Sequence, residues 1–246
     1  MRVRAGIIVA VLMAIGVACG SNDAERSRLD VMAASSLATA FEILESEFEA
    51  ANPDIDVRVT SGSSSNLALQ IENGAPADVF ASADESTMTK IADFLVPDYR
   101  VFATNELQIM VAPGNPKNIR SLADLQADDL IVITAQEGVP IRGYTDEVLT
   151  RAGVVANFRS FEANVGGIVT KITNGAADAG IVYRTDVIAT GSRASGVAIP
   201  AEQNVVARYP IAVLTSSTRR DDAAAFVAFL QGPGRDTLRE LGFGTP

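Results

Sequence analysis

The sequence predicts an α/β protein of two lobes, each a mixed sheet flanked by helices, with a cleft between the lobes. Short apolar segments with strand character alternate with segments of helical spacing, which is typical of a parallel or mixed sheet covered by helices. The segments 73–79 and 174–180 resemble each other, because in both an Asn-Gly pair ends a helix and a buried strand follows. Two lobes of similar architecture would produce this similarity between the two segments. A chain of 246 residues, 48% of them hydrophobic, can bury the cores of two small lobes.

The first residues predict export. Arg2 and Arg4 precede an apolar run over 5–18 that is too short to span a bilayer comfortably, so we assign 1–18 to a signal peptide. The only cysteine, Cys19, resembles the lipidated cysteine of bacterial lipoproteins, although that motif prefers leucine where this chain has Gly16. We expect a lipidated tether over 19–28 that anchors the protein to the outer face of the membrane. An ordinary signal peptide cleaved nearby, which would leave a periplasmic protein, is the alternative.

The first lobe is expected to begin with two strand–serine–helix units. A strand over 29–34 leads to Ser35 and Ser36 and then to a helix whose apolar positions are Leu37, Phe41, Leu44 and Phe48. A second strand over 55–60 leads to the polar junction 63–66 and a helix that contains Leu67 and Ile71. Serine and asparagine favour such junctions because their side chains accept hydrogen bonds from the first N–H groups of a helix. A buried strand over 77–82 follows.

The second lobe repeats this alternation. We expect strands over 107–112, 130–134 and 179–183, a short helix over 122–125 capped by Ser121, a loop over 136–144 that enters a helix near Thr145, and a helix opened by Asn164. A strand over 210–214 and helices around Phe226 and Leu238 then return to the first lobe. The predicted boundaries are 29–104 and 213–246 for lobe 1 and 105–212 for lobe 2.

Composition excludes several function classes. The net charge of −10 argues against nucleic-acid binding, which needs clustered lysine and arginine. The sequence has no histidine and one cysteine, so Ser–His–Asp and Cys–His catalysis and His/Cys zinc sites are all impossible. Phosphate-loop and dinucleotide-turn motifs are also missing from the sequence. An enzyme could work only through carboxylates, lysine or tyrosine, and no pair of these stands out in the sequence, so we expect a non-enzyme without a cofactor. No exposed apolar stripe is evident either, so we expect a monomer.

Three strand-to-helix junctions are candidates for a ligand site: 35–36, 63–66 and 164–166. Two belong to the first predicted lobe and one to the second, so they could face each other across the cleft. Their hydroxyl and backbone N–H donors, without lysine or arginine, suit a small ionised oxyanion, because the start of a helix attracts anions. The alternative is that these residues only cap their helices.

The same junctions resemble the periplasmic molybdate-binding proteins of ABC importers. In the family's order, the shared motifs are Ala-Ala-Ser-Ser-Leu over 33–37, Ser-Ser-Ser-Asn-Leu-Ala over 63–68, Gly-Ala-Pro-Ala-Asp-Val-Phe-Ala-Ser-Ala-Asp over 74–84, Val-Pro over 139–140, Asn-Val over 164–165 and Ala-Gly-Ile-Val-Tyr-Arg-Thr-Asp over 179–186. They span nearly all of the expected mature chain.

The resemblance implies the two-lobe periplasmic-binding-protein fold and a tetrahedral oxyanion held without a counter-charge. By position, it implies a molybdate-binding set of the Ser36 and Ser64 hydroxyls, the backbone N–H groups of Ile141 and Val165, and the phenol of Tyr183. The alternatives from the residues alone are simple capping for the serines and a buried core tyrosine.

One position departs from the family pattern. After Val-Pro the family has a small or apolar residue and then glycine, whereas here Ile141 is followed by Arg142 and then by Gly143. Arg142 is either a solvated surface charge, which we favour, or an additional contact to the anion that changes what is bound.

The resemblance leads to the hypothesis of a solute-binding protein that delivers molybdate or tungstate to an ABC importer permease. Another tetrahedral oxyanion, sulfate or phosphate, is the alternative of the same class. Alternatives of other classes are a carboxylate-based enzyme in the same cleft and a signalling or adhesion module.

Overall fold

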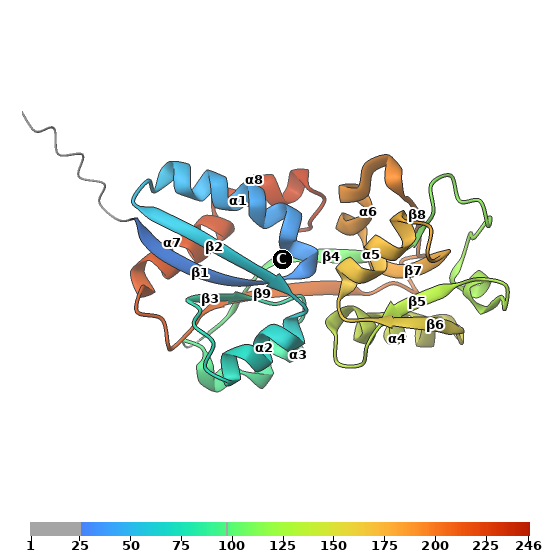
Figure 1. The fold of residues 1–246 in the computed structure, drawn as a ribbon, viewed down its shortest axis with the longest axis horizontal. Coiled ribbons are helices and arrows are strands. Elements are labelled where there is room, and N and C mark those ends of the chain that lie inside the picture. Colours follow the sequence, from blue (N-terminus) through green and yellow to red (C-terminus); the bar gives the residue numbers. More distant parts are fainter. Residues whose placement is uncertain (1–25, 97) are drawn as a thin grey trace, which may run out of the picture.

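The computed structural model describes residues 26–96 and 98–246, which form two groups of elements lying side by side (Figure 1). Strands β4 (Arg100–Val111) and β9 (Val206–Val213) run between the groups. The first group contains β1 (Ser27–Ala34), a 3-10 turn (Ser35–Leu37), α1 (Ala38–Ala51), β2 (Ile55–Gly62), α2 (Ser64–Glu72), β3 (Val79–Ala81), α3 (Glu85–Lys90), α7 (Arg220–Gln231) and α8 (Gly234–Glu240). The second contains β5 (Val132–Ala135), α4 (Pro140–Ala152), β6 (Phe158–Glu162), α5 (Val165–Thr173), β7 (Ala179–Tyr183), α6 (Arg184–Thr190) and β8 (Ser195–Ala198). The predicted α/β class is confirmed.

The strands follow the order β2-β1-β3-β9-β4-β7-β5-β6, and β8 pairs with β4. Neighbours inside each group are parallel, as in β1 with β2 and β3, or β5 with β6 and β7. The pairs that involve β4 or β9 are antiparallel. Each group is therefore a mixed sheet, and helices begin at the carboxyl ends of its parallel strands. This arrangement brings several helix N-termini to one edge of each sheet.

Strand β4 belongs to both groups. Its residues 100–106 pair with β9, whereas 107–111 pair with β7 and β8. The lobe boundaries predicted from the sequence, at 104/105 and 212/213, fall inside β4 and near the end of β9. They stay predictions.

The end of the chain packs against its beginning. Phe226 of α7 contacts Phe41 and Phe48 of α1 edge to face, with ring centroids 6.0 and 5.1 Å apart. All three side chains are buried. Edge-to-face packing is a favoured geometry for aromatic rings and adds to the free energy gained from burying them. Helix α1 is thereby held in place, and with it the Ser-Ser turn that precedes it.

In the second group, Gly180 allows α5 to lie close to β7. A Cβ at this position would lie 2.7 Å from Ile168 Cγ2 and 3.0 Å from the carbonyl oxygen of Ile133. A side chain here would push α5 away from the sheet. Because Val165 begins α5 and Tyr183 ends β7, this close packing also sets the distance between those two residues.

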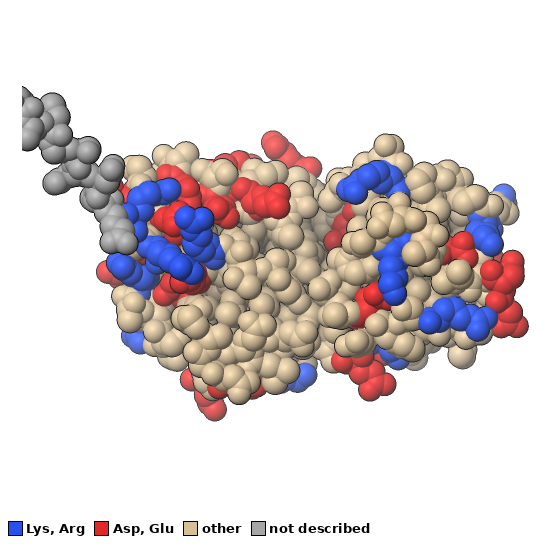
Figure 2. All heavy atoms as spheres, in the orientation of Figure 1, with Lys and Arg blue, Asp and Glu red and all other residues tan. Residues whose placement is uncertain are grey.

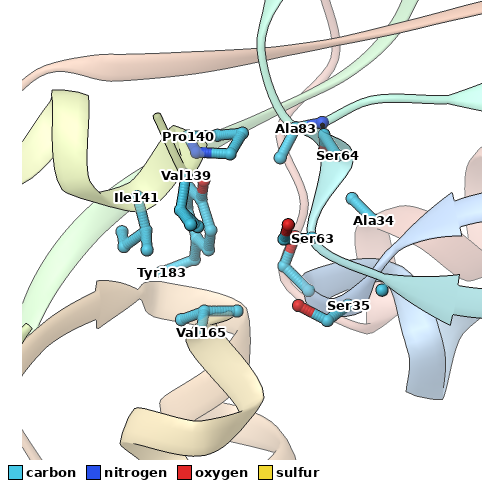
Figure 3. Close-up of a pocket in the computed structure, with 12 residues that line it drawn as sticks. Ala34, Ser35, Ser63, Ser64, Ala83, Val139, Pro140, Ile141, Val165 and Tyr183 are labelled. Atoms are coloured by element: carbon cyan, nitrogen blue, oxygen red, sulfur yellow. Dashed lines mark hydrogen bonds between the residues drawn. The ribbon is translucent and has the colours of Figure 1, made fainter. Parts of the chain in front are cut away.

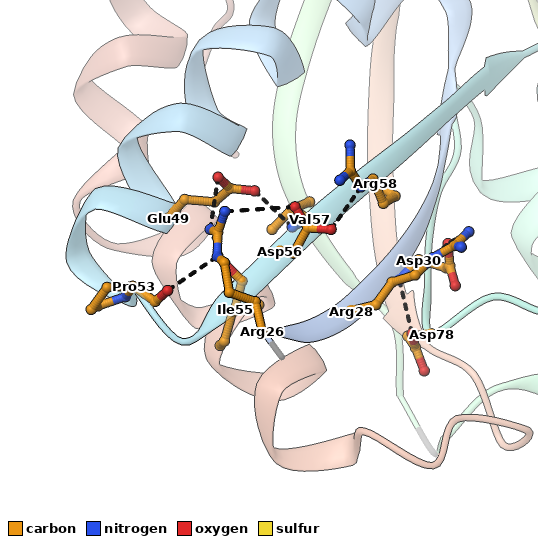
Figure 4. Close-up of polar contacts among 10 residues, drawn as sticks. All are labelled: Arg26, Arg28, Asp30, Glu49, Pro53, Ile55, Asp56, Val57, Arg58 and Asp78. Atoms are coloured by element: carbon orange, nitrogen blue, oxygen red, sulfur yellow. Dashed lines mark hydrogen bonds and ion pairs between the residues drawn. The ribbon is translucent and has the colours of Figure 1, made fainter. Parts of the chain in front are cut away.

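Arginine side chains form hydrogen bonds and ion pairs at the end of the first group where the described chain begins (Figure 4). Arg26 donates to the carbonyl of Pro53 over 3.1 Å and pairs with Glu49 at 2.9 Å, and Arg58 pairs with Asp56 at 2.7 Å. Figure 2 shows blue and red side chains gathered together at this end of the molecule. The middle of the same face, over β2 and α2, is mostly uncharged.

One sequence prediction is corrected. The helix expected near Thr145 begins at Pro140, because proline is well suited to the first position of a helix, where its missing N–H is not needed. Four elements were not predicted from the sequence, α3, β6, α6 and β8. The predicted signal peptide, Cys19 and most of the tether lie outside the described residues. Within the described ranges, none of the helices is long and apolar enough to cross a bilayer.

Candidate functional site

The strand-to-helix junctions of the two groups meet around one small cavity (Figure 3). The cavity has a volume of only about 10 Å³, so the space suits one small ion rather than an organic molecule. Residues from both groups line the cavity: Ala34, Ser35, Ser36, Gly62, Ser63, Ser64, Ala83, Val139, Pro140, Ile141, Val165 and Tyr183. The structure therefore brings together all five residues of the set that the resemblance implied.

Ser64 presents a hydroxyl whose proton is available to the cavity. It is the first residue of α2, behind Ser63, whose side chain accepts the N–H of Asn66 and caps the helix. The Ser64 oxygen accepts the backbone N–H of Ala83 over 2.9 Å. An N–H can only donate, so the Ser64 oxygen must be the acceptor and its own proton can point elsewhere. Ser64 is thus prepared to donate to an anion, and the capping role belongs to Ser63.

Ser36 is arranged in the same way in the turn that follows β1. Its oxygen accepts the hydroxyl of Tyr209, on β9, over 3.1 Å. Both residues are buried, with 8% of Ser36 exposed. With one lone pair occupied by Tyr209, the Ser36 proton is left to donate into the cavity.

Two helices of the second group add backbone donors. Pro140 has no N–H, so Ile141 carries the first one of α4, and Val165 carries the first one of α5. First-turn N–H groups have no acceptor inside their own helix and bear part of the positive end of the helix dipole. In α5 the Asn164 side chain accepts the N–H of Gly167. Val165 lines the cavity, and its N–H is available to a ligand there. Arg142 departs from the family pattern, but α4 begins at Pro140 and Ile141 still lines the cavity.

Tyr183 carries a buried hydroxyl without a partner. Only 1% of this residue is exposed, and among the described residues its Oη has no hydrogen-bond partner. A buried polar group in this state costs about 1 to 3 kcal/mol. Burial also raises the pKa of the Tyr183 phenol well above its ordinary value, with the neighbouring Tyr209 as a lesser cause, so the group stays protonated. Tyr183 is thus a donor that lacks an acceptor until something enters the cavity.

Formal charges stay outside the cavity. None of the described residues that line it is charged. Asp84 directly follows the lining residue Ala83, and the carboxylate of Asp186 accepts the backbone N–H of Tyr183 over 3.0 Å. Asp186 as a whole is half-buried, and burial of its carboxyl group raises the pKa to about 7. Within the described part of the chain, the site consists of neutral donors and dipoles.

Arg142 points away from these donors. Its guanidinium forms an ion pair with Asp146, one turn further along α4, at 2.8 Å. The same group lies 5.6 Å from the ring centroids of both Phe158 and Phe161 on β6. Among the residues described, Arg142 is not one that lines the cavity. The Arg142 side chain is 18% exposed, so these contacts cover most of it.

Two polar contacts lie beside the cavity. The Tyr144 hydroxyl on α4, in the second group, donates to the carbonyl of Ala83 in the first group over 3.3 Å. Arg208 on β9, which runs between the groups, pairs with Glu85 on α3 at 2.7 Å. Sequence reasoning missed Tyr144, Tyr209 and the lining residue Ala83. Of these, only Ala83 carried a signal, because it lies in a motif shared with the resembling family.

The sequence and the fold are similar to those of known proteins. A model of the family described as bacterial extracellular solute-binding protein matches residues 29–244. The chain is 38% identical to the molybdate-binding protein ModA of Mycobacterium tuberculosis, over 98% of this chain and 97% of the relative. It is 28% identical to ModA of Escherichia coli, over 91% of each. The solved structure of the Azotobacter vinelandii periplasmic molybdate-binding protein matches with a TM-score of 0.78 at 26% identity, covering 89% of this chain and 99% of that one.

These matches span nearly the whole described chain and confirm both the predicted resemblance to molybdate-binding proteins and the two-lobe fold. The chain belongs to the family of bacterial extracellular solute-binding proteins.

Proposed function

We propose that this protein captures molybdate or tungstate outside the cytoplasm and delivers it to the permease of an ABC importer. The observation that carries the proposal is the set of five neutral donors around one small cavity, among them a buried tyrosine hydroxyl without a partner. Relatives named as molybdate-binding proteins support the choice of ion. We further propose that the protein has no enzymatic activity, because its relatives bind solutes.

The five donors are the hydroxyls of Ser36, Ser64 and Tyr183 and the backbone N–H groups of Ile141 and Val165. Each would hold an oxygen of a tetrahedral oxyanion. Hydrogen bonds to a charged group contribute about 1.5 to 3 kcal/mol each, so a few of them in a dry cavity can hold a dianion without a cation. The net charge of −10 does not prevent this, because distant surface charges are screened by salt.

The donors come from both groups of elements, so a bound ion would join them. Ser36 precedes α1 and Ser64 begins α2 in the first group, whereas Ile141, Val165 and Tyr183 belong to the second. We propose that the groups act as the lobes predicted from the sequence, with β4 and β9 as the hinge, and that they close around the ion. The permease would then bind the closed form.

Isothermal titration calorimetry tests the proposal on protein that starts after Cys19, with molybdate, tungstate, sulfate and phosphate. We expect molybdate and tungstate to bind tightly and Ser64→Ala to weaken them by about tenfold or more, which corresponds to the loss of one charged hydrogen bond. Ser61→Ala, an exposed serine on β2, is the matched control and should bind as wild type. Arg142→Ala should also bind as wild type.

If the protein bound sulfate or phosphate but not molybdate, the proposed ion would be wrong, whereas the assignment as an oxyanion-binding protein would stand. Binding that survives Ser64→Ala but is lost with Arg142→Ala would refute the proposed site. The lipid anchor is tested separately: we expect the full chain in the membrane fraction and Cys19→Ala outside it. Light scattering should show a monomer.

A further inference from the structure

Two buried residues outside the cavity form a line of hydrogen bonds that ends on Ser36. Tyr209 on β9 donates its hydroxyl to Ser36 Oγ over 3.1 Å, and Asn105 Nδ2 on β4 lies 3.4 Å from Tyr209 Oη. The same amide nitrogen donates to Thr185 Oγ1 over 2.8 Å. Tyr209 is fully buried and Asn105 is 3% exposed. Neither side chain lines the cavity, and the five-donor set does not include them.

The direction of every hydrogen bond in this line is determined at its far end. The backbone N–H of Glu106 donates to Asn105 Oδ1 over 3.0 Å. Because a backbone N–H can only donate, Oδ1 must be the acceptor, and the Asn105 amide cannot turn round. Its Nδ2 therefore faces Tyr209 as a donor.

The remaining protons follow from this arrangement. Tyr209 Oη receives a hydrogen bond from Asn105 and directs its own proton to Ser36 Oγ. That oxygen is then an acceptor toward Tyr209, so the Ser36 proton must point elsewhere, and the cavity is the open direction. Burial raises the pKa of Tyr209 well above its ordinary value, so the phenol keeps the proton that it donates.

We propose that Tyr209 and Asn105 are positioning residues that hold the Ser36 hydroxyl as a donor toward the bound oxyanion. The inference rests on the proposed function of the cavity. A hydroxyl that can rotate either donates or accepts, and an anion gains only when it donates. Fixing the direction beforehand avoids the free-energy cost of turning the hydroxyl when the ion binds. The Ser64 hydroxyl is oriented in the same way, because its oxygen accepts the N–H of Ala83.

A double-mutant cycle tests the inference by calorimetric titration with molybdate. The proteins are wild type, Tyr209→Phe, Ser36→Ala and the combined variant. Tyr209→Phe keeps the ring that packs edge to face on Tyr183 and Phe243, so it should fold as wild type, which thermal unfolding checks. We expect it to weaken molybdate binding about fivefold to tenfold in the Ser36 protein and to have almost no effect when Ser36 is already alanine.

Two further variants sharpen the cycle. Asn105→Ala should give a smaller loss, because its contact to Tyr209 is the longest in the line, and that loss should also vanish in the Ser36→Ala background. Thr237→Val removes a side-chain hydroxyl on α8 that donates to Glu47 at 2.9 Å, away from the cavity, and should bind as wild type.

The outcomes separate this inference from the function on which it rests. Equal binding by wild type and Tyr209→Phe would overturn the positioning role while leaving the site intact. An equal loss with and without Ser36 would also overturn it, because a residue that only stabilises the fold acts in both backgrounds. If wild type bound none of the four oxyanions, the proposed function would fall and the inference with it.

Discussion

The hydroxyl of Tyr144 donates a hydrogen bond to the carbonyl oxygen of Ala83 over 3.3 Å, from α4 on one side of the cavity to the β3–α3 connection on the other. The N–H of Ala83 in turn donates to Ser64, so this contact ends on the same short stretch of backbone that orients one of the proposed donors. A link of this kind favours the closed arrangement and falls away when the two groups separate.

Tyr144→Phe is therefore expected to loosen the closed form. The variant loses one neutral hydrogen bond, worth about 1 kcal/mol, so molybdate should dissociate about fivefold faster, with little change in the association rate. Stopped-flow measurement of both rates checks this, and Thr237→Val, whose hydroxyl donates to Glu47 away from the cavity, is the control. An unchanged dissociation rate would show that the contact does not contribute to closure.

Tyr183→Phe should have opposite effects on stability and on binding. Without ligand, removing an unpartnered buried hydroxyl should raise the free energy of unfolding by about 1 kcal/mol or leave it unchanged. Molybdate affinity should fall by about tenfold or more, because a charged hydrogen bond is lost. Thermal unfolding and calorimetric titration of the same sample measure the two effects. A less stable variant with normal affinity would mean that the hydroxyl serves the fold and not the ligand.

Val165→Pro tests a backbone donor directly. Val165 is the first residue of α5, a position where proline fits a helix, and Asn164 before it has the extended conformation that a following proline requires. The substitution removes the N–H while keeping the helix, so we expect about a tenfold or greater loss of molybdate affinity with unchanged helix content by circular dichroism. Val165→Ala keeps the N–H and should lose much less. Equal losses in the two variants would assign the effect to the side chain.

The titration of the Asp186 carboxyl group is expected to make the stability of the protein depend on pH. Burial raises the pKa of its carboxyl group from 3.8 to about 7, against the smaller opposing effect of the Tyr183 N–H. The folded state therefore binds a proton that the unfolded state has released, so this group lowers stability as pH rises from about 4 to 7. Asp186→Asn should remove that loss while its side-chain oxygen still accepts the Tyr183 N–H.

Urea unfolding of wild type and Asp186→Asn at several values between pH 4 and pH 8 measures the effect. The stability of the variant relative to wild type should increase up to about pH 7 and then level off. A difference that stays constant over the whole range would show that Asp186 does not titrate there.

Local signals made much of the fold predictable. Asn164 followed by Val165, Ile168 and Ile172 at helical spacing is enough to place α5, because the cap and the apolar face lie within one short segment. Strand β6 gave no such signal, because its residues are alternately exposed and half-buried and include Arg159 and Glu162. The start of α4 was missed because glycines at 138 and 143 made a loop the simpler interpretation.

The site was only partly predictable from the residues. Ser36, Ser64 and Val165 stood out because they lie where strands lead into helices, whereas Ile141 and Tyr183 entered only through the family resemblance. Tyr209 and Tyr144 could not be found in this way, because their partners lie 173 and 61 residues away in the chain. Tertiary structure alone brings such pairs together.

The most direct test of the central claim is a crystal structure grown with molybdate, in which the anomalous signal of molybdenum locates the ion without assumptions about the protein. We expect one strong peak in the cavity between the two groups, with oxyanion oxygens about 2.7 to 3.2 Å from the Ser36, Ser64 and Tyr183 hydroxyls and the Ile141 and Val165 nitrogens. A peak elsewhere, or an ion held by Arg142 or another cation, would contradict the account.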